Sequence, residues 1–339
     1  MTEDRLPGSA LLPLAYRECR QIAATHGRTY FLATRLLSAE RRPAVHALYA
    51  FARMVDDVVD RAGRPAAAHD RDPAAELDLI ERDLRAALES RPGSASAAPH
   101  ASSADRQNDR SWESGPRPRA LVLTAVTHTI HRYDIAAQHF WTFLDSMRMD
   151  APGAPAFRNR YATMAQLREY MRGSAAAIGL QLLPVLGTVV PVSAAEPAAA
   201  ALGEAFQLTN FLRDVAEDLD RDRVYLPADA LAAFGVDDAL LFECRRTGRT
   251  DPRVRRALAH LIAVNRDLYR RAEPGIDLLE PRVRPAIRTA ATLYSDILHH
   301  IERSDYAVFG HRAVVPRHHR LRIAATEFTT ATLRGRLTR

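Results

Sequence analysis

Polar side chains recur at helical spacing in the segment YAFARMVDDVVD, residues 49–60. At 100° per residue they fall within about a 60° arc and form one line along a helix: Tyr49, Arg53, Asp56 and Asp60, with Asp57 at the edge. The residues between them are apolar, which indicates that the line faces a protein interior rather than solvent. Buried carboxylates are unfavourable unless a cation compensates their charge. The segment therefore suggests a cation site.

A second line of oxygen-bearing side chains follows in GEAFQLTNFLRDVAEDLDRDRVYLP, residues 203–227. At positions i, i+3, i+7 and i+11 its members share about an 80° arc: Gln207, Asn210, Asp214 and Asp218. Oxygen ligands without Cys or His select hard divalent cations, and Mg²⁺ completes its coordination with water and substrate phosphate. A single such line is usually a solvated helix face. Two lines on two helices favour a metal-dependent diphosphate site between them.

The elements that must position these lines are predicted to be helices. Strand patterns are scarce, and Ala, Leu and Arg dominate at helical spacing, so we predict an all-α protein. A helix start at Leu36 and Leu37 is expected to lead into a helix over 42–59, with Pro43 in its first turn. Further helices are expected over 76–90, 119–149, 162–183, 194–220, 251–271 and 280–304. We expect one domain over 1–310, with a disordered insertion over 91–118 that is rich in Ser, Ala and Pro.

The composition excludes several classes of chemistry. None of the 47 basic side chains is a lysine, so a Schiff base, a pyridoxal phosphate anchor and a P-loop are excluded. Cys19 and Cys244 have no disulfide or zinc-site spacing, and the N-terminus shows no signal peptide, so we expect a cytoplasmic protein. The net charge of +6 resides in residues 311–339, which hold seven Arg and one Glu. Because the rest of the chain is neutral, the pI of 9.7 does not indicate nucleic-acid binding.

The stretch from Gly173 to Ala195 contains no charged residue. Its length exceeds the roughly 18 apolar residues that raise the possibility of a membrane span. Gln181, Pro184 and Pro191 interrupt it, and a helix surrounded by other helices also shows apolar residues on every side. We therefore favour a buried helix over a membrane span.

Three segments resemble the characteristic segments of the squalene and phytoene synthase family. They are THGRTYFLATRLLSAERRPAVHALYAFARMVDDVVD at 25–60, YMRGSAAAIGLQLLPVL at 170–186 and LGEAFQLTNFLRDVAEDLDRDRVYLP at 202–227. The resemblance covers residues 16–306, and it implies the all-helical isoprenoid synthase fold with its acidic motifs facing across the mouth of a deep cavity. The form of the segments looks most like the bacterial phytoene-forming members.

The resemblance also implies a reaction. Family members join two identical prenyl diphosphates head to head through a cyclopropylcarbinyl diphosphate, and release diphosphate. For this chain we expect geranylgeranyl diphosphate as substrate, two or three Mg²⁺ ions with Mn²⁺ as an alternative ion, no NADPH, and a role in carotenoid biosynthesis. The alternative is dehydrosqualene or squalene synthesis from farnesyl diphosphate. An inactive assembly factor with this fold is disfavoured, because such a protein should have lost motif aspartates and all four are present.

The family's functional positions match residues of this chain one by one. The implied catalytic residues are Asp56, Asp60, Asp214, Asp218 and Tyr170, and the implied metal ligands are the same aspartates with Asn210. The implied substrate-binding residues are Tyr49, Arg53, Gln207, Asn210, Arg213, Arg223 and Tyr225 at the diphosphates, His26, Thr29 and Tyr30 in an N-terminal loop, Tyr294 in the cavity, and Ala175, Ile178, Gly179 and Leu182 along the prenyl tunnel.

Several of these positions have a second interpretation. Arg213 lies more than 100° from its line, which favours an outer salt bridge. His26, Tyr170 and Tyr294 are also compatible with a purely structural role. The family often has serine at the positions of Gly27 and Thr29. The basic tail 311–339 suits either peripheral contact with the inner face of the cell membrane or a solvated end. The sequence predicts no oligomeric state.

Overall fold

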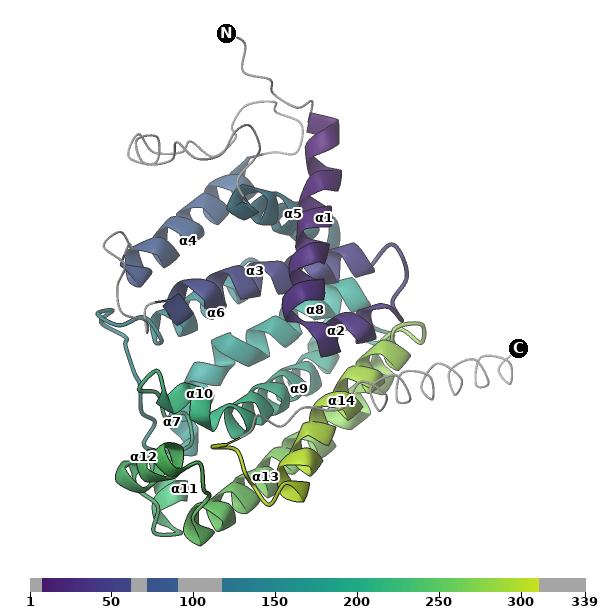
Figure 1. Ribbon diagram of the computed structural model, residues 1–339. Coiled ribbons are helices and arrows are strands. Elements are labelled where there is room, and N and C mark those ends of the chain that lie inside the picture. The colour runs from purple at the N-terminus through teal and green to yellow at the C-terminus, as the bar shows by residue number, and fades with distance from the viewer. Residues whose placement is uncertain (1–7, 62–71, 91–117, 311–339) are drawn as a thin grey trace, which may run out of the picture.

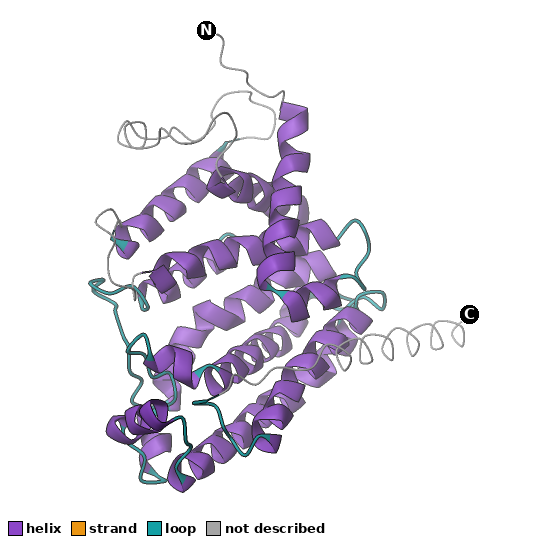
Figure 2. Ribbon diagram, viewed as in Figure 1, coloured by secondary structure: helices purple, strands orange, loops and turns teal. Residues whose placement is uncertain are grey.

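The computed structural model describes residues 8–61, 72–90 and 118–310. Within these ranges the chain is helical and contains no β-strand, which confirms the all-α prediction (Figure 2). The expected insertion over 91–118 lies outside the described residues except for Pro118, and the basic tail 311–339 lies outside them entirely.

The described ranges contain α-helices, one π-helix and one 3₁₀ helix, joined by turns and loops (Figure 1). They are α1 (Gly8–His26), α2 (Arg28–Thr34), α3 (Arg42–Arg61), α4 (Pro73–Glu89), α5 (Pro118–Tyr133), α6 (Gln138–Arg148), α7 (Met164–Met171), the π-helix η2 (Arg172–Ala176), α8 (Ala177–Leu186), α9 (Val192–Arg213), α10 (Val215–Leu219), α11 (Ala228–Ala232), α12 (Asp238–Thr247), α13 (Pro252–Ala272), the 3₁₀ helix η3 (Glu273–Leu278) and α14 (Arg284–Arg303).

Helix α9 lies at the centre of one half of the molecule and packs against α8, α13 and α14. Helix α3 belongs to the other half, where it packs against α1 and α5 and also contacts α8. The two helices expected to carry the polar lines, α3 and α9, therefore stand on either side of α8.

Several helix boundaries differ from the sequence-based expectation. Leu36 and Leu37 lie between α2 and α3, so the expected helix start there is wrong and the helix begins at Arg42. The expected helix over 119–149 is two helices, because Asp134 adopts a left-handed conformation with φ of +50°, which Asp tolerates better than most residues. The helix over 162–183 contains a π turn, and the helix over 194–220 breaks at Asp214. Helices α1, α2, α11 and α12 are not anticipated from the sequence patterns.

Two glycines allow α9 to approach α8 and the π-helix η2 closely. A Cβ atom on Gly179 of α8 would lie 2.5 Å from the carbonyl oxygen of Ala199, and one on Gly203 of α9 would lie 2.5 Å from that of Ala175. Both obstacles are backbone atoms, which cannot rotate away. Glycine is therefore required at both of these contacts of α9.

We expect Gly179→Ala to destabilise the protein, although alanine in place of an ordinary helix-interior glycine stabilises it by about 1 kcal/mol. The methyl group would overlap the carbonyl of Ala199, and overpacking of this kind costs about 1–3 kcal/mol. Urea unfolding of the variant and the wild type would measure the difference. A more stable variant would contradict the close approach of α8 and α9.

None of the helices in the described ranges has both the length and the apolarity needed to cross a membrane. The uncharged stretch from Gly173 to Ala195 is divided among η2, α8, a short connection and the first turn of α9. The preference for a buried helix over a span is consistent with this division.

Beneath α2, His46 of α3 is 1% exposed and shares a hydrogen bond of 3.0 Å with the hydroxyl of Thr34. Burial, with the nearby positive charges of Arg20 and Arg42, lowers the pKa of His46 to about 4. Between pH 6.5 and 4 the unfolded chain therefore binds a proton that the folded chain does not, so stability falls as the pH falls through this range.

We expect His46→Asn to flatten the pH dependence of stability, because one titrating group contributes a slope of up to about 1.4 kcal/mol per pH unit. Urea unfolding of wild type and variant at pH 4.5, 5.5 and 7 would measure the two slopes. The readout is the change in slope rather than the absolute stability, which the substitution also alters. Equal slopes would contradict a buried neutral imidazole.

Candidate active site

The first polar line lies along one face of α3, and the rest of this helix is packed into the core. Phe51, Val55 and Val58 are at most 3% exposed, which fixes the rotation of the helix and leaves Asp56 and Asp60 partly buried. Burial and the neighbouring charge of Asp60 raise the pKa of Asp56 to about 7. The fold therefore disfavours the charged form of Asp56 in the absence of a cation.

The same line contains an ion pair. Arg53 donates a short hydrogen bond to Asp57, one turn further along α3. The guanidinium therefore stays on the face of the helix that carries Asp56 and Asp60.

The second polar line crosses a break between two helices. Helix α9 ends at Arg213, and Asp214 leaves the helical conformation with φ of −101° and ψ of 17°. The hydrogen bonds nevertheless continue, because the Asp214 N–H donates to the Asn210 carbonyl at 2.8 Å and the Asp218 N–H donates to the Asp214 carbonyl at 2.9 Å. The four residues of the line remain in sequence along α9 and α10. Burial and the charge of Asp214 raise the pKa of Asp218 well above its usual range.

Arg213 forms a bidentate ion pair with Asp214, with Nε–Oδ1 and Nη2–Oδ2 distances of 2.7 and 2.5 Å. The Arg213 side chain points away from the polar line, but it still belongs to the site because its guanidinium binds the Asp214 carboxylate. This is the geometry expected of a residue that orients a carboxylate rather than one that faces the cavity.

The loop after α10 links the two polar lines. Arg221 lies 3.5 Å and Arg223 lies 3.7 Å from carboxylate oxygens of Asp60 on α3. Arg223 is buried and also donates to the carbonyl of Val59 at 3.2 Å. The end of the first line is therefore joined to the segment that follows the second line.

The residues of the two lines fit a hard divalent cation. All of their ligand atoms are oxygens, the type that Mg²⁺ prefers. The Oδ1 atom of Asn210 is buried without a hydrogen-bond partner, while the Nδ2 atom of the same side chain donates to Gln207 at 3.3 Å. An unpaired oxygen beside carboxylates with raised pKa values is suited to a cation. Among the described residues, no group of three or more Asp, Glu, His or Cys side chains is close enough together to hold a metal ion without further ligands.

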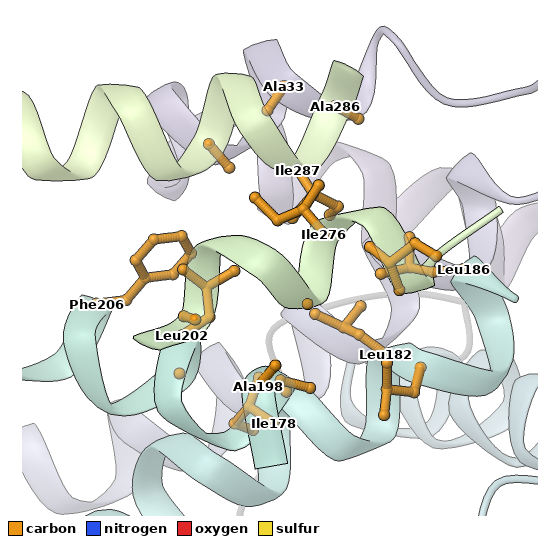
Figure 3. Close-up of a pocket in the computed structure, with 18 of the residues that line it drawn as sticks. Ala33, Ile178, Leu182, Leu186, Ala198, Leu202, Phe206, Ile276, Ala286 and Ile287 are labelled. Carbon is orange, nitrogen blue, oxygen red and sulfur yellow. The ribbon is translucent and has the colours of Figure 1, made fainter. Parts of the chain in front are cut away.

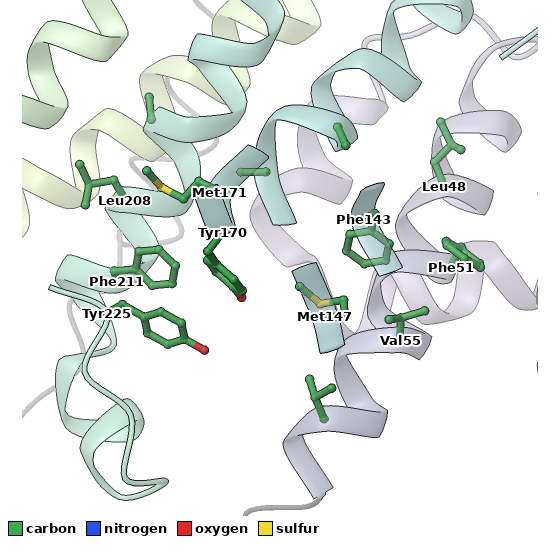
Figure 4. Close-up of a cluster of buried hydrophobic side chains, with 14 of the residues drawn as sticks. Leu48, Phe51, Val55, Phe143, Met147, Tyr170, Met171, Leu208, Phe211 and Tyr225 are labelled. Carbon is green, nitrogen blue, oxygen red and sulfur yellow. The ribbon is translucent and has the colours of Figure 1, made fainter. Parts of the chain in front are cut away.

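A buried aspartate that the sequence analysis missed lies between the two lines. Asp150 follows α6 and is 3% exposed. Tyr170 donates to its Oδ2 atom at 2.5 Å, and Tyr225 donates to its Oδ1 atom at 2.8 Å. Figure 4 shows both tyrosines with their hydroxyl ends directed to the same side. Burial and the charge of Asp150 raise the pKa of Tyr170 well above its usual range, so this hydroxyl keeps its proton.

Aromatic side chains border the first line at its N-terminal end. The rings of Tyr30 and Tyr49 are stacked, with centroids 5.3 Å apart. Gly27 lies directly against Tyr49, because a Cβ atom there would be 2.7 Å from ring carbon Cζ. A larger residue at position 27 would therefore require the Tyr49 ring to move. His26 is exposed at the end of α1, and the Thr29 side chain lies outside the described residues.

An apolar cavity extends from this region between α2, α8, α9, η3 and α14 (Figure 3). It has about 190 Å³ of room for the centres of water-sized molecules. Ala175, Ile178, Gly179 and Leu182, which were expected to line a prenyl tunnel, all lie in its wall. Tyr294 lies behind the wall, stacked on the lining residue Phe206 with ring centroids 4.4 Å apart.

The cavity meets both polar lines. Gln207 belongs to the second line and lines the cavity, and Tyr30, which stacks on Tyr49 of the first line, lines it as well. Tyr170 and Tyr225 do not line this cavity and belong instead to the buried cluster around Asp150. The site thus has an acidic part and an apolar part, which suits a molecule with an anionic head and a hydrocarbon tail.

The squalene/phytoene synthase family model matches residues 23–319, which include both polar lines and the whole cavity wall. The chain belongs to the squalene/phytoene synthase family. The members of this family are head-to-head prenyltransferases that act on prenyl diphosphates, so the chain is an enzyme of that type.

Curated relatives of similar length support this membership. The chain is 33% identical to a phytoene synthase from Arthrospira platensis over 89% of its own length and 88% of the relative. It is 34% identical to a 15-cis-phytoene synthase from Synechococcus elongatus, over 91% of its own length and 92% of the relative.

Solved structures confirm the isoprenoid synthase fold. A dehydrosqualene synthase in complex with a ligand superposes with a TM-score of 0.75 at 24% identity, over 95% of this chain and 98% of the other. A squalene synthase from Alicyclobacillus acidocaldarius superposes with a TM-score of 0.66 at 23% identity, over 89% and 97%.

Proposed function

We propose that the protein is a phytoene synthase, which condenses two geranylgeranyl diphosphates head to head into phytoene for carotenoid biosynthesis. The observation that carries this proposal is an apolar cavity that Gln207 of the second polar line borders and that Tyr30 connects to Tyr49 of the first line. The full-length similarity to phytoene synthases supports it. The cavity takes the hydrocarbon chains, and the acidic end takes the diphosphates.

Asp56, Asp60, Asn210, Asp214 and Asp218 would hold two or three Mg²⁺ ions. Bound there, Mg²⁺ neutralises diphosphate oxygens and favours departure of diphosphate from the allylic carbon. The raised pKa values of Asp56 and Asp218 and the unpaired oxygen of Asn210 support this assignment.

The chain's own residues contribute binding, orientation and exclusion of water. Arg53 and Arg223 offer planar guanidinium groups to the diphosphate oxygens. Because the chain contains no lysine, arginine is the basic residue available for this role, and its planar group suits phosphate oxygens. Arg213 holds Asp214 in a fixed orientation through two hydrogen bonds. The wall of the cavity is almost entirely hydrocarbon, so the allylic cation meets the double bond of the second substrate rather than water.

The proposal includes no reductant, because formation of phytoene ends in loss of a proton rather than in hydride transfer. It also places the enzyme in the cytoplasm, held at the inner face of the membrane by the basic segment 311–339. Seven arginines against one glutamate support that contact, at roughly 1 kcal/mol for each basic residue near anionic lipid.

The test is incubation of the purified protein with geranylgeranyl diphosphate and Mg²⁺ without NADPH, followed by extraction of products. We expect phytoene, and no product after EDTA treatment. A parallel reaction with farnesyl diphosphate is the control for chain length. Turnover of farnesyl diphosphate alone, or a requirement for NADPH, would favour dehydrosqualene or squalene synthesis and contradict the proposal.

A further inference from the structure

Asp150 lies on neither acidic line, yet it is buried and contacts three other residues of the site. Both of its oxygens are used, since Oδ2 accepts from Tyr170 at 2.5 Å and Oδ1 accepts from Tyr225 at 2.8 Å. Tyr170 belongs to α7, whereas Tyr225 belongs to the loop after α10. One side chain thus fixes two hydroxyls that come from separate segments.

The main chain of Asp150 adds a third connection. Its carbonyl accepts a hydrogen bond of 2.9 Å from Nη2 of Arg223, the same nitrogen that donates to the carbonyl of Val59. Nη1 of Arg223 lies 3.7 Å from Asp60. The residue therefore joins the end of the first acidic line to the loop that follows the second.

The position of Asp150 is electrostatically unfavourable for a group with a merely structural role. Its side chain is a 3% exposed carboxylate, and Arg223, which its main chain contacts, lies 3.7 Å from Asp60 of the first line, so a buried acidic group stands close to other carboxylates of the site. The surroundings are otherwise suited to apolar packing, because the Phe211 and Tyr225 rings are stacked at 4.2 Å and the Tyr161 and Tyr225 rings at 5.8 Å. Buried ionic groups are often replaceable by apolar ones without loss of stability.

We propose that Asp150 is a positioning residue of the active site, which holds the hydroxyls of Tyr170 and Tyr225, and through its main chain Arg223, at fixed places between the two acidic lines. The inference rests on the proposed function, because it assumes that the diphosphates and their metal ions bind between those lines. It assigns Asp150 no contact with the substrate. The carboxylate acts through the groups that it orients.

The first test is Asp150→Asn, an isosteric change that leaves the main-chain contact to Arg223 and replaces one acceptor oxygen by a donor. We expect turnover of the prenyl diphosphate used by the wild type to fall about 10- to 100-fold, as for other residues that orient ligands and catalytic groups. The matched control is Asp145→Asn, because Asp145 is an exposed aspartate of α6 in an ion pair with Arg148. We expect its activity to stay within about twofold of the wild type.

The second test separates positioning from a general loss of stability. If Asp150 acts through the tyrosines, Asp150→Asn should reduce turnover by less than about threefold further in a Tyr170→Phe/Tyr225→Phe background, because the groups that it orients are already absent. Losses that multiply independently would overturn the proposal. So would a fall in activity that merely follows the fraction of unfolded protein, measured by circular dichroism at the assay temperature.

A binding measurement keeps the inference separate from the proposed function. Calorimetric titration with Mg²⁺ and inorganic diphosphate requires no turnover and no prenyl chain. We expect Asp150→Asn to weaken this binding about tenfold and Asp145→Asn to leave it unchanged. If the wild type forms no phytoene but still binds Mg²⁺ and diphosphate more tightly than Asp150→Asn, only the proposed reaction is refuted. If the wild type and Asp150→Asn bind equally, the role of Asp150 is refuted.

Discussion

Replacement of Asp56 or Asp214 by asparagine is expected to abolish turnover, with a loss of about 10³-fold or more, while helicity stays unchanged. Each aspartate belongs to one polar line, and each change removes a negative charge while keeping the shape of the side chain. Stabilisation of a leaving diphosphate by metal ions contributes several kcal/mol, and every 1.36 kcal/mol corresponds to about a factor of ten in rate. Initial rates at several Mg²⁺ concentrations and far-ultraviolet circular dichroism would measure the two effects.

Asp56→Asn has a second expected consequence. Burial and the charge of Asp60 raise the pKa of Asp56 to about 7, so the metal-free fold disfavours the charged form of this carboxylate. Removing the charge should leave the metal-free protein at least as stable as the wild type at pH 7. Loss of activity would then not result from unfolding.

The control for these variants is Glu217→Gln. Glu217 is exposed on α10, next to Asp218 but outside the polar line, and its replacement removes one negative charge from the same helix. We expect its rate to stay within about threefold of the wild type. Full activity in Asp56→Asn or Asp214→Asn would remove the metal-site assignment.

Ile178→Trp is expected to prevent turnover of geranylgeranyl diphosphate, with a loss of at least about 100-fold. Ile178 projects from α8 into the apolar cavity (Figure 3), where only about 190 Å³ is open to the centres of water-sized molecules. An indole group would fill part of the space for the prenyl chain, and hydrocarbon burial is worth about 0.8 kcal/mol per methylene. Farnesyl diphosphate, which is shorter, should lose less of its activity.

The matched control is Val192→Trp, which places the same group at an exposed position at the start of α9. Rates with both diphosphates and binding of Mg²⁺ with inorganic diphosphate should be compared in the two variants. We expect Ile178→Trp to retain binding of inorganic diphosphate, because none of the aspartates of the two polar lines belongs to the cavity wall. Equal loss of both activities in Val192→Trp would contradict a specific role for the cavity.

Local periodicity was sufficient to predict the two polar lines. The residues from Tyr49 to Asp60 share one face because α3 is a regular helix, and this depends on neighbours within the segment alone. The same holds for the uncharged stretch from Gly173, whose residues form part of the cavity wall. The second line continues from α9 into α10 despite the break at Asp214, because backbone hydrogen bonds of helical type continue across the break.

The sequence did not reveal Asp150. A single aspartate after a helix has no periodic partner, and its contacts with Tyr170, Tyr225 and Arg223 join positions 20 to 75 residues apart. Its depth of burial was the missing signal, and burial depends on how α6 and α7 pack against the loop after α10. The sequence patterns also joined α5 and α6 into one helix, because a left-handed conformation at a single residue, Asp134, leaves no periodic signal.

The sequence by itself determined the helical class, the two acidic lines and the ligand chemistry, because residue type and spacing within one helix fix which side chains share a face. Only the tertiary structure decided that both lines meet one apolar cavity, that Arg221 and Arg223 reach Asp60, and that Asp150 stands between them. These relations depend on how helices pack, as at α9, where two glycines without Cβ atoms permit its close approach to α8 and η2. Periodicity describes one helix at a time, whereas a site between helices is a property of their packing.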